Sequence, residues 1–461
     1  MATAAILLGW IDAATHEVML FAAAGLLIGG ADDLLIDLIY LLRHLAGRDR
    51  AVMLDALPPP PSPGRFAILV PAWNEAGVIG AMLRATLARL DHPDFRIFVG
   101  CYPNDPATIA EVLAAAADSR IRPVIGARDG PTTKADCLGT LWRALGARDA
   151  EDGRRTTAIV LHDAEDVVHP AELRVFDALL ADHAAVQVPV LPLIHRHARL
   201  ISGLYAGDFA ESHGKQMVVR AALGAALPFA GVGCAIRTDA LDDIAAAHGT
   251  PFDPGSLTED YELGLRLATA GHATCFARVR ERRGGPLITV REYFPASIDA
   301  AVAQQARWMT GIALAGWDRM GWGRWRDIGD HWMRMRDRRA PLAVIVVAAS
   351  YAAIVGWSLS AAGHALTGLA VPAPTAFLPA MLLFNLLLLI WRAAMRIAFT
   401  VAAYGWREGL WAVPRMAVGN IIALLAARRA TMRYVRILAG HAPYWDKTAH
   451  VFPADLPDAA A

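Results

Sequence analysis

The sequence has few cysteines and no excess of charge of either sign. Its four cysteines are far apart in 461 residues and form no Cys-x-x-Cys pair, so their spacing predicts neither a zinc site nor a disulfide framework and fits a reducing compartment. The 44 basic residues balance 44 acidic residues, which gives a formal net charge of +0. This balance argues against a protein that binds nucleic acid through a broad positive field.

The N-terminus lacks a basic region before its first apolar run and lacks a small-residue cleavage site, so we expect it to remain attached. Apolar residues, in contrast, are abundant. They make up 55% of the chain, and the mean hydropathy is +0.35. Because this excess is concentrated near the two ends, it predicts membrane helices on either side of a soluble region, in a chain long enough for two or three structural units.

The first apolar segment, residues 18–42, is long enough to cross a bilayer, since about 20 helical residues span the hydrocarbon. It contains Asp32, Asp33 and Asp37, and each aspartate at the bilayer centre would cost roughly 2.5 to 3.5 kcal/mol on insertion scales. We expect a spanning helix whose aspartates are neutral and paired with protein groups. The alternative is a helix that lies at the interface after residue 31.

A second membrane region follows the soluble part. Residues 341–362 and 377–390 are predicted to form a helical hairpin with an uncharged connection at 362–376. Arginines lie before the first helix and after the second, whereas the connection has none, which places the soluble domain in the cytosol by the positive-inside rule. Residues 410–427 have basic residues on both sides, so we expect a helix along the cytosolic interface rather than a span.

These features divide the chain into five parts. They are residues 1–50 (membrane helix and cytosolic flank), 51–64 (Pro-rich linker), 65–325 (soluble domain), 326–400 (basic flank and transmembrane hairpin) and 401–461 (interfacial helix and tail). The proline run in the linker predicts an extended, semi-rigid connection.

The soluble domain alternates apolar strands with helical runs. Strands are expected at 66–70, 95–99 and 158–161, and helices at 78–90 and 107–117. This alternation predicts an α/β domain with a mainly parallel sheet. Open sheets of this kind bind ligands at the carboxyl ends of their strands, so the residues that follow each strand are the first candidates for a site.

Polar motifs follow the first two strands. PAWNE at 71–75 offers amide and carboxylate groups to a nucleobase or ribose, although capping of the next helix explains them too. YPND at 102–105 offers a stacking ring and a further carboxylate, with a plain turn as the alternative. The predicted substrate-binding residues of the two motifs are Pro71, Trp73, Asn74, Glu75, Tyr102, Asn104 and Asp105.

The third strand leads into HDAED at 162–166. Three acids within four residues repel one another, and a divalent cation relieves that repulsion. Hard carboxylate oxygens suit Mg²⁺ or Mn²⁺, which would also neutralise a diphosphate leaving group. The sequence therefore predicts a metal site at Asp163, Glu165 and Asp166. The alternative is a solvated turn that precedes the next helix.

SLTEDYE at 256–262 begins a predicted helix. Ser256 and Glu259 have the spacing of a capping box, so a structural role is the alternative for this motif. Burial and nearby acids can raise a carboxyl pKa toward that of a general base. Asp260 is accordingly the candidate that deprotonates an acceptor hydroxyl, with Glu259 beside it.

Two further motifs supply polar groups. Lys134, at the end of PTTK, is a candidate contact for the base or diphosphate, and a surface lysine is the alternative. QQARW at 304–308 puts Gln304, Arg307 and Trp308 on one helix face, where a ring beside a cation and an amide suits a sugar and a diphosphate. A tryptophan and arginine at the membrane interface would explain the same residues.

In this order, the motifs PAWNE, YPND, TTK, HDAED, LTED and QQARW resemble those of the family 2 glycosyltransferases, which include cellulose and hyaluronan synthases. The resemblance covers about residues 66–321. YPND, HDAED and the tail PYWDKT at 443–448 are most similar to the phage adsorption protein B type of inner-membrane glycosyltransferase. The fold that this resemblance implies is the GT-A nucleotide-sugar-binding domain.

The resemblance also implies an activity and assigns roles. A multi-pass protein of the bacterial inner membrane would transfer a hexose, by one inverting displacement, from a nucleotide-diphosphate sugar (a UDP-sugar above others) to a growing polysaccharide or other glycan. The implied nucleoside contacts are Asn74, Glu75 and Asp105; the Asp163 cluster would hold Mg²⁺ or Mn²⁺, Asp260 would be the base, and Gln304, Arg307 and Trp308 would line the acceptor end. The family's metal motif is Asp-x-Asp, so Glu165 and the additional Asp166 leave the second ligand open.

The sequence leaves alternative functions open. The enzyme could add one sugar to a lipid carrier or a protein, or the chain could be a non-catalytic membrane scaffold or phage-adsorption subunit. Intact acids at the catalytic positions favour an enzyme. Members of the adsorption protein B type can carry a further regulatory domain, so we expect control or export to involve a partner subunit, with membrane lipids around the helices.

Overall fold

The soluble part is built on a seven-stranded sheet in the order β4-β3-β2-β5-β7-β6-β8. The computed structural model describes residues 2–60, 62–441 and 450–455. The strands are β2 (Phe66–Pro71), β3 (Phe95–Cys101), β4 (Ile121–Ile125), β5 (Ala158–Leu161), β6 (Ala185–Gln187), β7 (Cys234–Arg237) and β8 (Thr274–Phe276). β7 runs antiparallel to β5 and β6, and the other neighbours pair in parallel. The predicted α/β domain with a mainly parallel sheet is confirmed.

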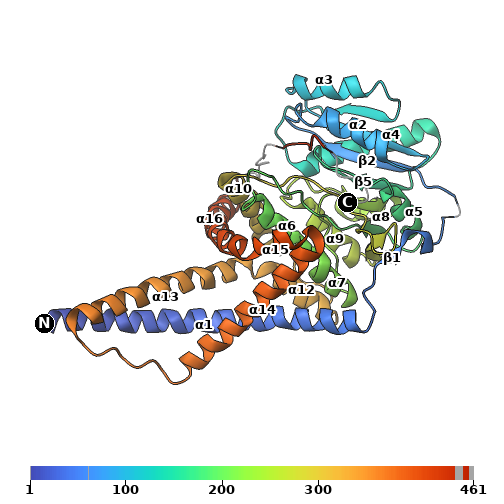
Figure 1. Cartoon of the computed structure of the whole chain (residues 1–461). Coiled ribbons are helices and arrows are strands. Elements are labelled where there is room, and N and C mark those ends of the chain that lie inside the picture. The colour runs from blue at the N-terminus through green and yellow to red at the C-terminus, as the bar shows by residue number, and fades with distance from the viewer. Residues whose placement is uncertain (1, 61, 442–449, 456–461) are drawn as a thin grey trace.

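Helices cover both faces of this sheet (Figure 1). Alternate residues of β2 face opposite sides: Phe66, Ile68 and Val70 pack in one core, whereas Ala67 and Leu69 pack in the other. The first core includes residues of α2 (Ile79–Arg89), α3 (Pro106–Ala115) and α5 (Glu172–Leu179). The second includes residues of α4 (Lys134–Asp152), α8 (Thr238–His248) and α9 (Glu259–Thr269).

The first part of the predicted linker forms strand β1 (Val52–Met53) and the short 3-10 helix η1 (Leu54–Ala56). β1 pairs in parallel with β9 (Val279–Arg280) of the soluble domain. The linker therefore begins as ordered structure rather than as a free extended chain.

Three helices are long and apolar enough to span a membrane: α1 (Ala2–Leu45), α13 (Ala340–Thr367) and α14 (Leu378–Tyr404). All three are longer than predicted. α1 and α13 lie side by side along most of their length, and α14 crosses α1 (Figure 1). Glycines allow the close approach, because a Cβ at Gly25 or Gly356 would lie 2.5 Å from a side-chain atom of the facing helix.

The three aspartates in the second half of α1 are ion-paired. Arg336 and Arg339 both contact Asp32 and Asp33, and Lys215 contacts Asp37. The helix continues unbroken through them, and whether it spans a membrane or becomes interfacial after residue 31 stays a prediction. The expected pairing of these aspartates with protein groups is thus observed, and each partner is a cationic side chain.

Further helices lie between the sheet and the membrane-type helices (Figure 1). They are α6 (Ser202–Glu211), the π-helix η2 (Ser212–Gln216), α7 (Met217–Ala222), α10 (Ile298–Trp308), the π-helix η3 (Met309–Leu314), α11 (Ala315–Met320), α12 (Ile328–Arg338), α15 (Trp406–Leu410) and α16 (Ala412–Leu438). α16 contains most of the predicted interfacial segment 410–427 and packs against α10. Its buried Arg415 pairs with Glu408, which explains a charge within an apolar run.

Candidate active site

The PAWNE and YPND motifs lie together because β2 and β3 are parallel neighbours. The backbone N–H of Asn74 donates to Asp105 Oδ2 at 2.5 Å, and Asn74 has a φ of 54°, a left-handed conformation that asparagine tolerates. Asp105 also caps α3 through the Thr108 N–H at 3.3 Å. The start of α2 has no side-chain cap, so the capping alternative for Asn74 and Glu75 is wrong.

Aromatic rings form one wall beside these motifs. Trp73 and Tyr102 meet edge to face, with ring centroids 5.1 Å apart. Gly130 lies against both rings, and a Cβ there would be 2.6 Å from Trp73. Asn104 holds this glycine through hydrogen bonds of 2.8 and 2.9 Å to its backbone, while Pro71 is the buried last residue of β2. The nucleoside-binding role of these residues stays a prediction.

The acids of HDAED divide between the surface and the interior. The Asp163 side chain is 30% exposed and pairs with Lys134 Nζ at 2.5 Å. Asp166 is buried and lies 2.7 Å from His162 Nδ1, whose other ring nitrogen lies 3.0 Å from Glu172 Oε1. Burial opposes a charge on His162, but the two carboxylates outweigh it and raise its pKa to about 10.

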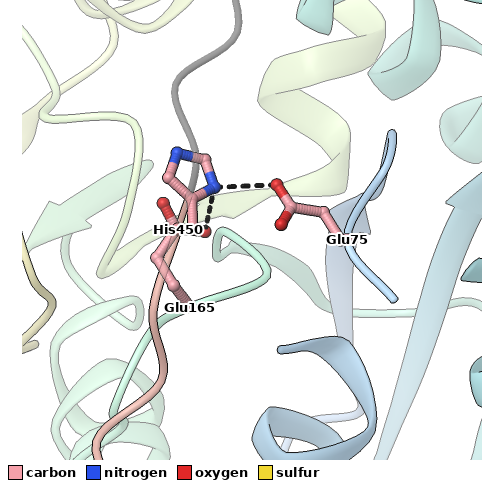
Figure 2. Close-up of side chains that lie close together, drawn as sticks. All are labelled: Glu75, Glu165 and His450. Atoms are coloured by element: carbon pink, nitrogen blue, oxygen red, sulfur yellow. Dashed lines mark hydrogen bonds and ion pairs between the residues drawn. The ribbon is translucent and has the colours of Figure 1, made fainter. Parts of the chain in front are cut away.

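Glu165 faces a histidine from the C-terminal tail (Figure 2). His450 Nδ1 lies 2.7 Å from Glu75 Oε1 and 3.1 Å from Glu165 Oε2. One ring nitrogen can donate only one proton, and Glu165 Oε2 is buried without a hydrogen bond from the described residues. Burial raises the Glu165 pKa to about 7, with His450 opposing this rise.

This group has the composition of a cation site. Single ligand atoms of Glu75, Glu165 and His450 lie within 4.8 Å of one another. Two carboxylate oxygens and an imidazole nitrogen suit Mn²⁺, and the unbonded Glu165 oxygen is an acceptor that a cation would satisfy. Buried Glu292 lies beside this group. Burial, followed by the charges of Asp166 and Glu165, raises its pKa well above the ordinary value and so favours its protonated form.

The second acidic motif begins α9, but not as a capping box. Thr258 is the N-cap residue and makes no side-chain cap bond. Ser256 lies two residues before it. Its hydroxyl donates to Glu262 Oε1 at 2.7 Å and accepts the N–H of Thr258 at 3.2 Å, not the N–H of Glu259 that a capping box requires. The predicted capping box is therefore wrong, and Glu259 is free of that role.

Lys134 joins the two acidic motifs. Besides Asp163, its Nζ lies 4.0 Å from Glu259 Oε1 and donates to the Gly231 carbonyl at 3.4 Å. The Lys134 side chain is only 12% exposed, so the surface-lysine alternative is wrong. Gly231, at a φ of 80°, leaves room for Asp260, since a Cβ there would lie 2.7 Å from Asp260 Oδ2.

Both carboxyls at the start of α9 have raised pKa values. Burial, followed by neighbouring Asp260, raises the Glu259 pKa to about 7. Burial also raises the Asp260 pKa, while Lys134 and Arg307 oppose the rise. The site therefore contains carboxyls suited to exchange a proton near neutral pH.

Replacing Glu259 with glutamine should change the dependence of stability on pH. Glu259 ionises at its ordinary value of 4.5 in the unfolded chain and at about 7 in the folded protein. Its contribution to the stability of the wild-type protein is thus full below pH 4.5 and is lost as the pH rises through 7. Between about pH 5 and pH 8 the thermal midpoint of the wild type should fall relative to that of Glu259→Gln. The prediction is contradicted if the difference in thermal midpoint between wild type and Glu259→Gln stays constant with pH. It is also contradicted if the exposed control Glu281→Gln shows the same change with pH.

The QQARW motif lies beside Asp260 at the end of α10. Arg307 Nη1 donates to the Leu257 carbonyl at 3.4 Å, just before α9. Trp308 and Asp260 both line a cavity of about 380 Å³. This cavity extends to Asp33 of α1, Arg336 of α12, Arg339 just before α13 and Arg392 of α14. The role of Gln304, whose Oε1 is buried without a described hydrogen bond, stays a prediction.

Residues 63–311, more than half of the chain, match the family described as glycosyltransferase like family 2. The chain belongs to this family. The glycosyltransferase is 34% identical, over 456 aligned residues, to bacteriophage adsorption protein B of Escherichia coli (strain K12) and to bacteriophage N4 adsorption protein B of Escherichia coli O157:H7. Each alignment covers 93% of this chain and 61% of the relative, so the chain spans about three fifths of their length.

A solved structure shares the fold of this glycosyltransferase. The mannosyltransferase PcManGT from Pyrobaculum calidifontis, in complex with GDP-Man and Mn²⁺, superposes with a TM-score of 0.53 at 16% identity and covers 88% of this chain and 99% of its own. The predicted GT-A fold and both predicted resemblances are confirmed. Family and fold are those of proteins that transfer sugars.

Several residues of the glycosyltransferase site were not predicted from the sequence: His450, Glu172 and Glu292. Glu292 could have been found, because in 288–292 it occupies the same face as the core residues Ile288 and Val290. The tail motif at 443–448 lies outside the described residues.

Proposed function

We propose that this glycosyltransferase transfers a hexose from a nucleotide-diphosphate sugar, a UDP-sugar above others, to a growing polysaccharide with inversion at the sugar. The observation that carries this proposal is the Lys134 bridge, which puts the half-buried acid Asp163 and the buried acids at the start of α9 around one ammonium group. Such a transfer needs a cation, an acid that can bind a metal ion, and a carboxyl group with a raised pKa.

A divalent cation fits the acidic edge of the sheet. Glu165, with its unbonded oxygen, and His450 are the ligands we favour, and Asp163 and Glu75 lie beside them. When bound, Mg²⁺ or Mn²⁺ would neutralise the diphosphate leaving group. Asp166 is already engaged by His162, which supports a positioning role for it. The Mn²⁺ in the PcManGT complex adds support.

The remaining residues orient the reactants. Trp73 and Tyr102 offer flat surfaces beside Asn74 for a nucleobase, and Lys134 offers positive charge for the diphosphate. Asp260 would take the proton from the acceptor hydroxyl as the sugar is transferred. This assignment rests on its burial, its raised pKa and the open cavity in front of it.

The acceptor would approach from the membrane. The cavity of about 380 Å³ connects Asp260 and Trp308 with Arg336, Arg339 and Arg392, which lie where α1, α13 and α14 meet the soluble part. Arginines at this end, and none in the 368–377 connection, support a bacterial inner membrane location with the catalytic domain in the cytosol. The same arginines favour a second candidate function, addition of one sugar to a lipid-linked phosphate acceptor.

A donor panel tests the proposal. Purified protein in nanodiscs would be incubated with UDP-, GDP- and dTDP-sugars and Mn²⁺ or Mg²⁺, and nucleotide release measured. We expect turnover of one donor class and a loss of at least about 100-fold on chelation, since a bound metal supplies several kcal/mol of charge stabilisation. If no donor is turned over, the proposal is wrong. The mass of the product distinguishes polymer from single transfer.

A further inference from the structure

The first turn of α9 carries Asp260, and no N-cap side chain holds this turn. Thr258 is the N-cap residue and makes no side-chain cap bond. The backbone N–H of Tyr261 donates to Asp260 Oδ1 at 2.8 Å, so the carboxyl lies against the start of its own helix. The orientation of this carboxyl therefore depends on contacts that fix the first turn from outside the helix.

Side chains of the first turn contact other elements. Glu262 Oε1 accepts hydrogen bonds from Ser256 and from Arg319 of α11, each at 2.7 Å. The Tyr261 hydroxyl instead donates to Asp337 Oδ2 of α12 at 2.9 Å. Tyr261 therefore links the start of α9 to the helix that leads into α13.

Arg220 of α7 fixes the acceptor of this hydrogen bond. Its Nη1 lies 2.8 Å from Asp337 Oδ1, and its Nε donates to the Ala226 carbonyl at 2.5 Å. Arg220 and Tyr261 are each only 4% exposed. An ion pair that is largely shielded from water is screened little by salt, and hydrogen bonds to a charged acceptor are strong. Asp337 is thus a fixed, charged acceptor for the Tyr261 hydroxyl.

This network of Arg220, Asp337 and Tyr261 lies on the wall of the cavity of about 380 Å³. All three residues line this cavity, as does Asp260. On α12, Arg336 precedes Asp337 and pairs with aspartates of α1. The end of α12 therefore contacts both the membrane-type helix α1 and the helix that carries Asp260.

We propose that Tyr261 and Asp337 are positioning residues for Asp260. Their hydrogen bond sets the rotation of the first turn of α9, and this rotation directs the Asp260 carboxyl to the cavity where the acceptor hydroxyl would lie. A displacement of about 1 Å at a reacting group can cost on the order of 10²-fold in rate, so a single hydroxyl at this position has a measurable effect. This role rests on the proposed function, in which Asp260 is the base.

Replacing Tyr261 with phenylalanine removes only the hydroxyl, and Asp337 keeps Arg220 as its partner. With the donor sugar that the wild type turns over in nanodiscs, we expect kcat to fall by about 10- to 100-fold while KM for the donor stays unchanged. A purely structural role would lower the thermal midpoint without this split. Tyr434→Phe is the matched control, because the Tyr434 hydroxyl also donates to an aspartate, Asp318 of α11. Its kcat should equal that of the wild type.

A double-variant cycle tests whether Tyr261 acts through Asp260. Asp260→Asn has no base to orient, so adding Tyr261→Phe should lower kcat further by less than about twofold. An independent catalytic role would make the two losses multiply. The positioning role is overturned if Tyr261→Phe has the wild-type kcat, if the losses multiply, or if Tyr434→Phe loses as much. If Tyr261→Phe does not fold, Asp337→Asn is measured by the same criteria.

Hydrogen–deuterium exchange supplies a readout that needs no turnover. The backbone amides of residues 259–265 should exchange faster in Tyr261→Phe than in the wild type, because the first turn loses its contact with α12, and at the wild-type rate in Tyr434→Phe. Equal rates in Tyr261→Phe and the wild type overturn the positioning role. If the wild type turns over no donor, the proposed function is wrong, and exchange alone decides whether Tyr261 orders this turn. If a donor is turned over and Tyr261→Phe has the wild-type kcat, only the positioning role is wrong.

Discussion

Replacing Asp260 with asparagine lowers kcat for sugar transfer by about 10²- to 10⁴-fold, the usual contribution of a general base. Asparagine keeps the size of the side chain and an oxygen that can accept the Tyr261 N–H, a contact of 2.8 Å in the wild type. It cannot accept the proton of an acceptor hydroxyl. The Kd of the donor nucleotide should stay unchanged, because the assigned nucleotide contacts lie at the ends of β2 and β3.

Asp299→Asn is the matched control for this variant. Asp299 also lies in the first turn of a helix, but it is exposed. Its kcat should equal that of the wild type. A wild-type kcat for Asp260→Asn would exclude Asp260 as the base, and a parallel loss of nucleotide binding would point to a positioning role instead.

Replacing Lys215 with methionine lowers the free energy of unfolding by about 3 to 5 kcal/mol, the usual effect of removing one partner from a buried ion pair. Lys215 is 3% exposed and joins Asp37 of α1 to Glu211 of α6, the latter at 2.7 Å. Glu211 keeps Arg396 as a partner, but Asp37 loses its cation. The expected loss is measured by denaturant titration in detergent micelles.

Two controls separate charge from shape. Arg143→Met removes a cation from the solvent-facing side of α4 and should change stability little. Lys215→Met/Asp37→Asn removes both charges and should recover part of the loss. The explanation fails if Lys215→Met is as stable as the wild type or if the double variant is no better than the single one.

The sheet and much of the site could be predicted because their signals are local. Each apolar strand is followed directly by its polar motif, and parallel pairing brings the ends of β2, β3 and β5 to one edge. HDAED and LTED therefore indicated buried acids at the correct elements. The nearest neighbours of these acids, such as Lys134, could be named from the same motifs.

Other contacts could not be predicted because their partners are far apart in the chain. His450 reaches Glu75 across 375 residues, and no spacing rule connects a tail to a strand end. The capping box failed for a different reason: Ser256 and Glu259 have the correct spacing, but the helix begins at Glu259 with Thr258 as its N-cap residue. The aspartates of α1 were expected to be paired with protein groups, but the partners could not be named because Lys215, Arg336 and Arg339 are far away in the sequence.

The ion pairs of α1 also imply an order of events during synthesis and assembly of the chain. Asp32 on α1 and its partner Arg336 are 304 residues apart. At about 5 to 20 residues per second, a ribosome needs roughly 15 to 60 seconds to make that much chain. During that interval the aspartates must remain hydrated or be held by another protein, because α12 and α13 do not yet exist. The assembly of α1 with α13 and α14 is therefore a late, long-range step that follows synthesis of the soluble domain.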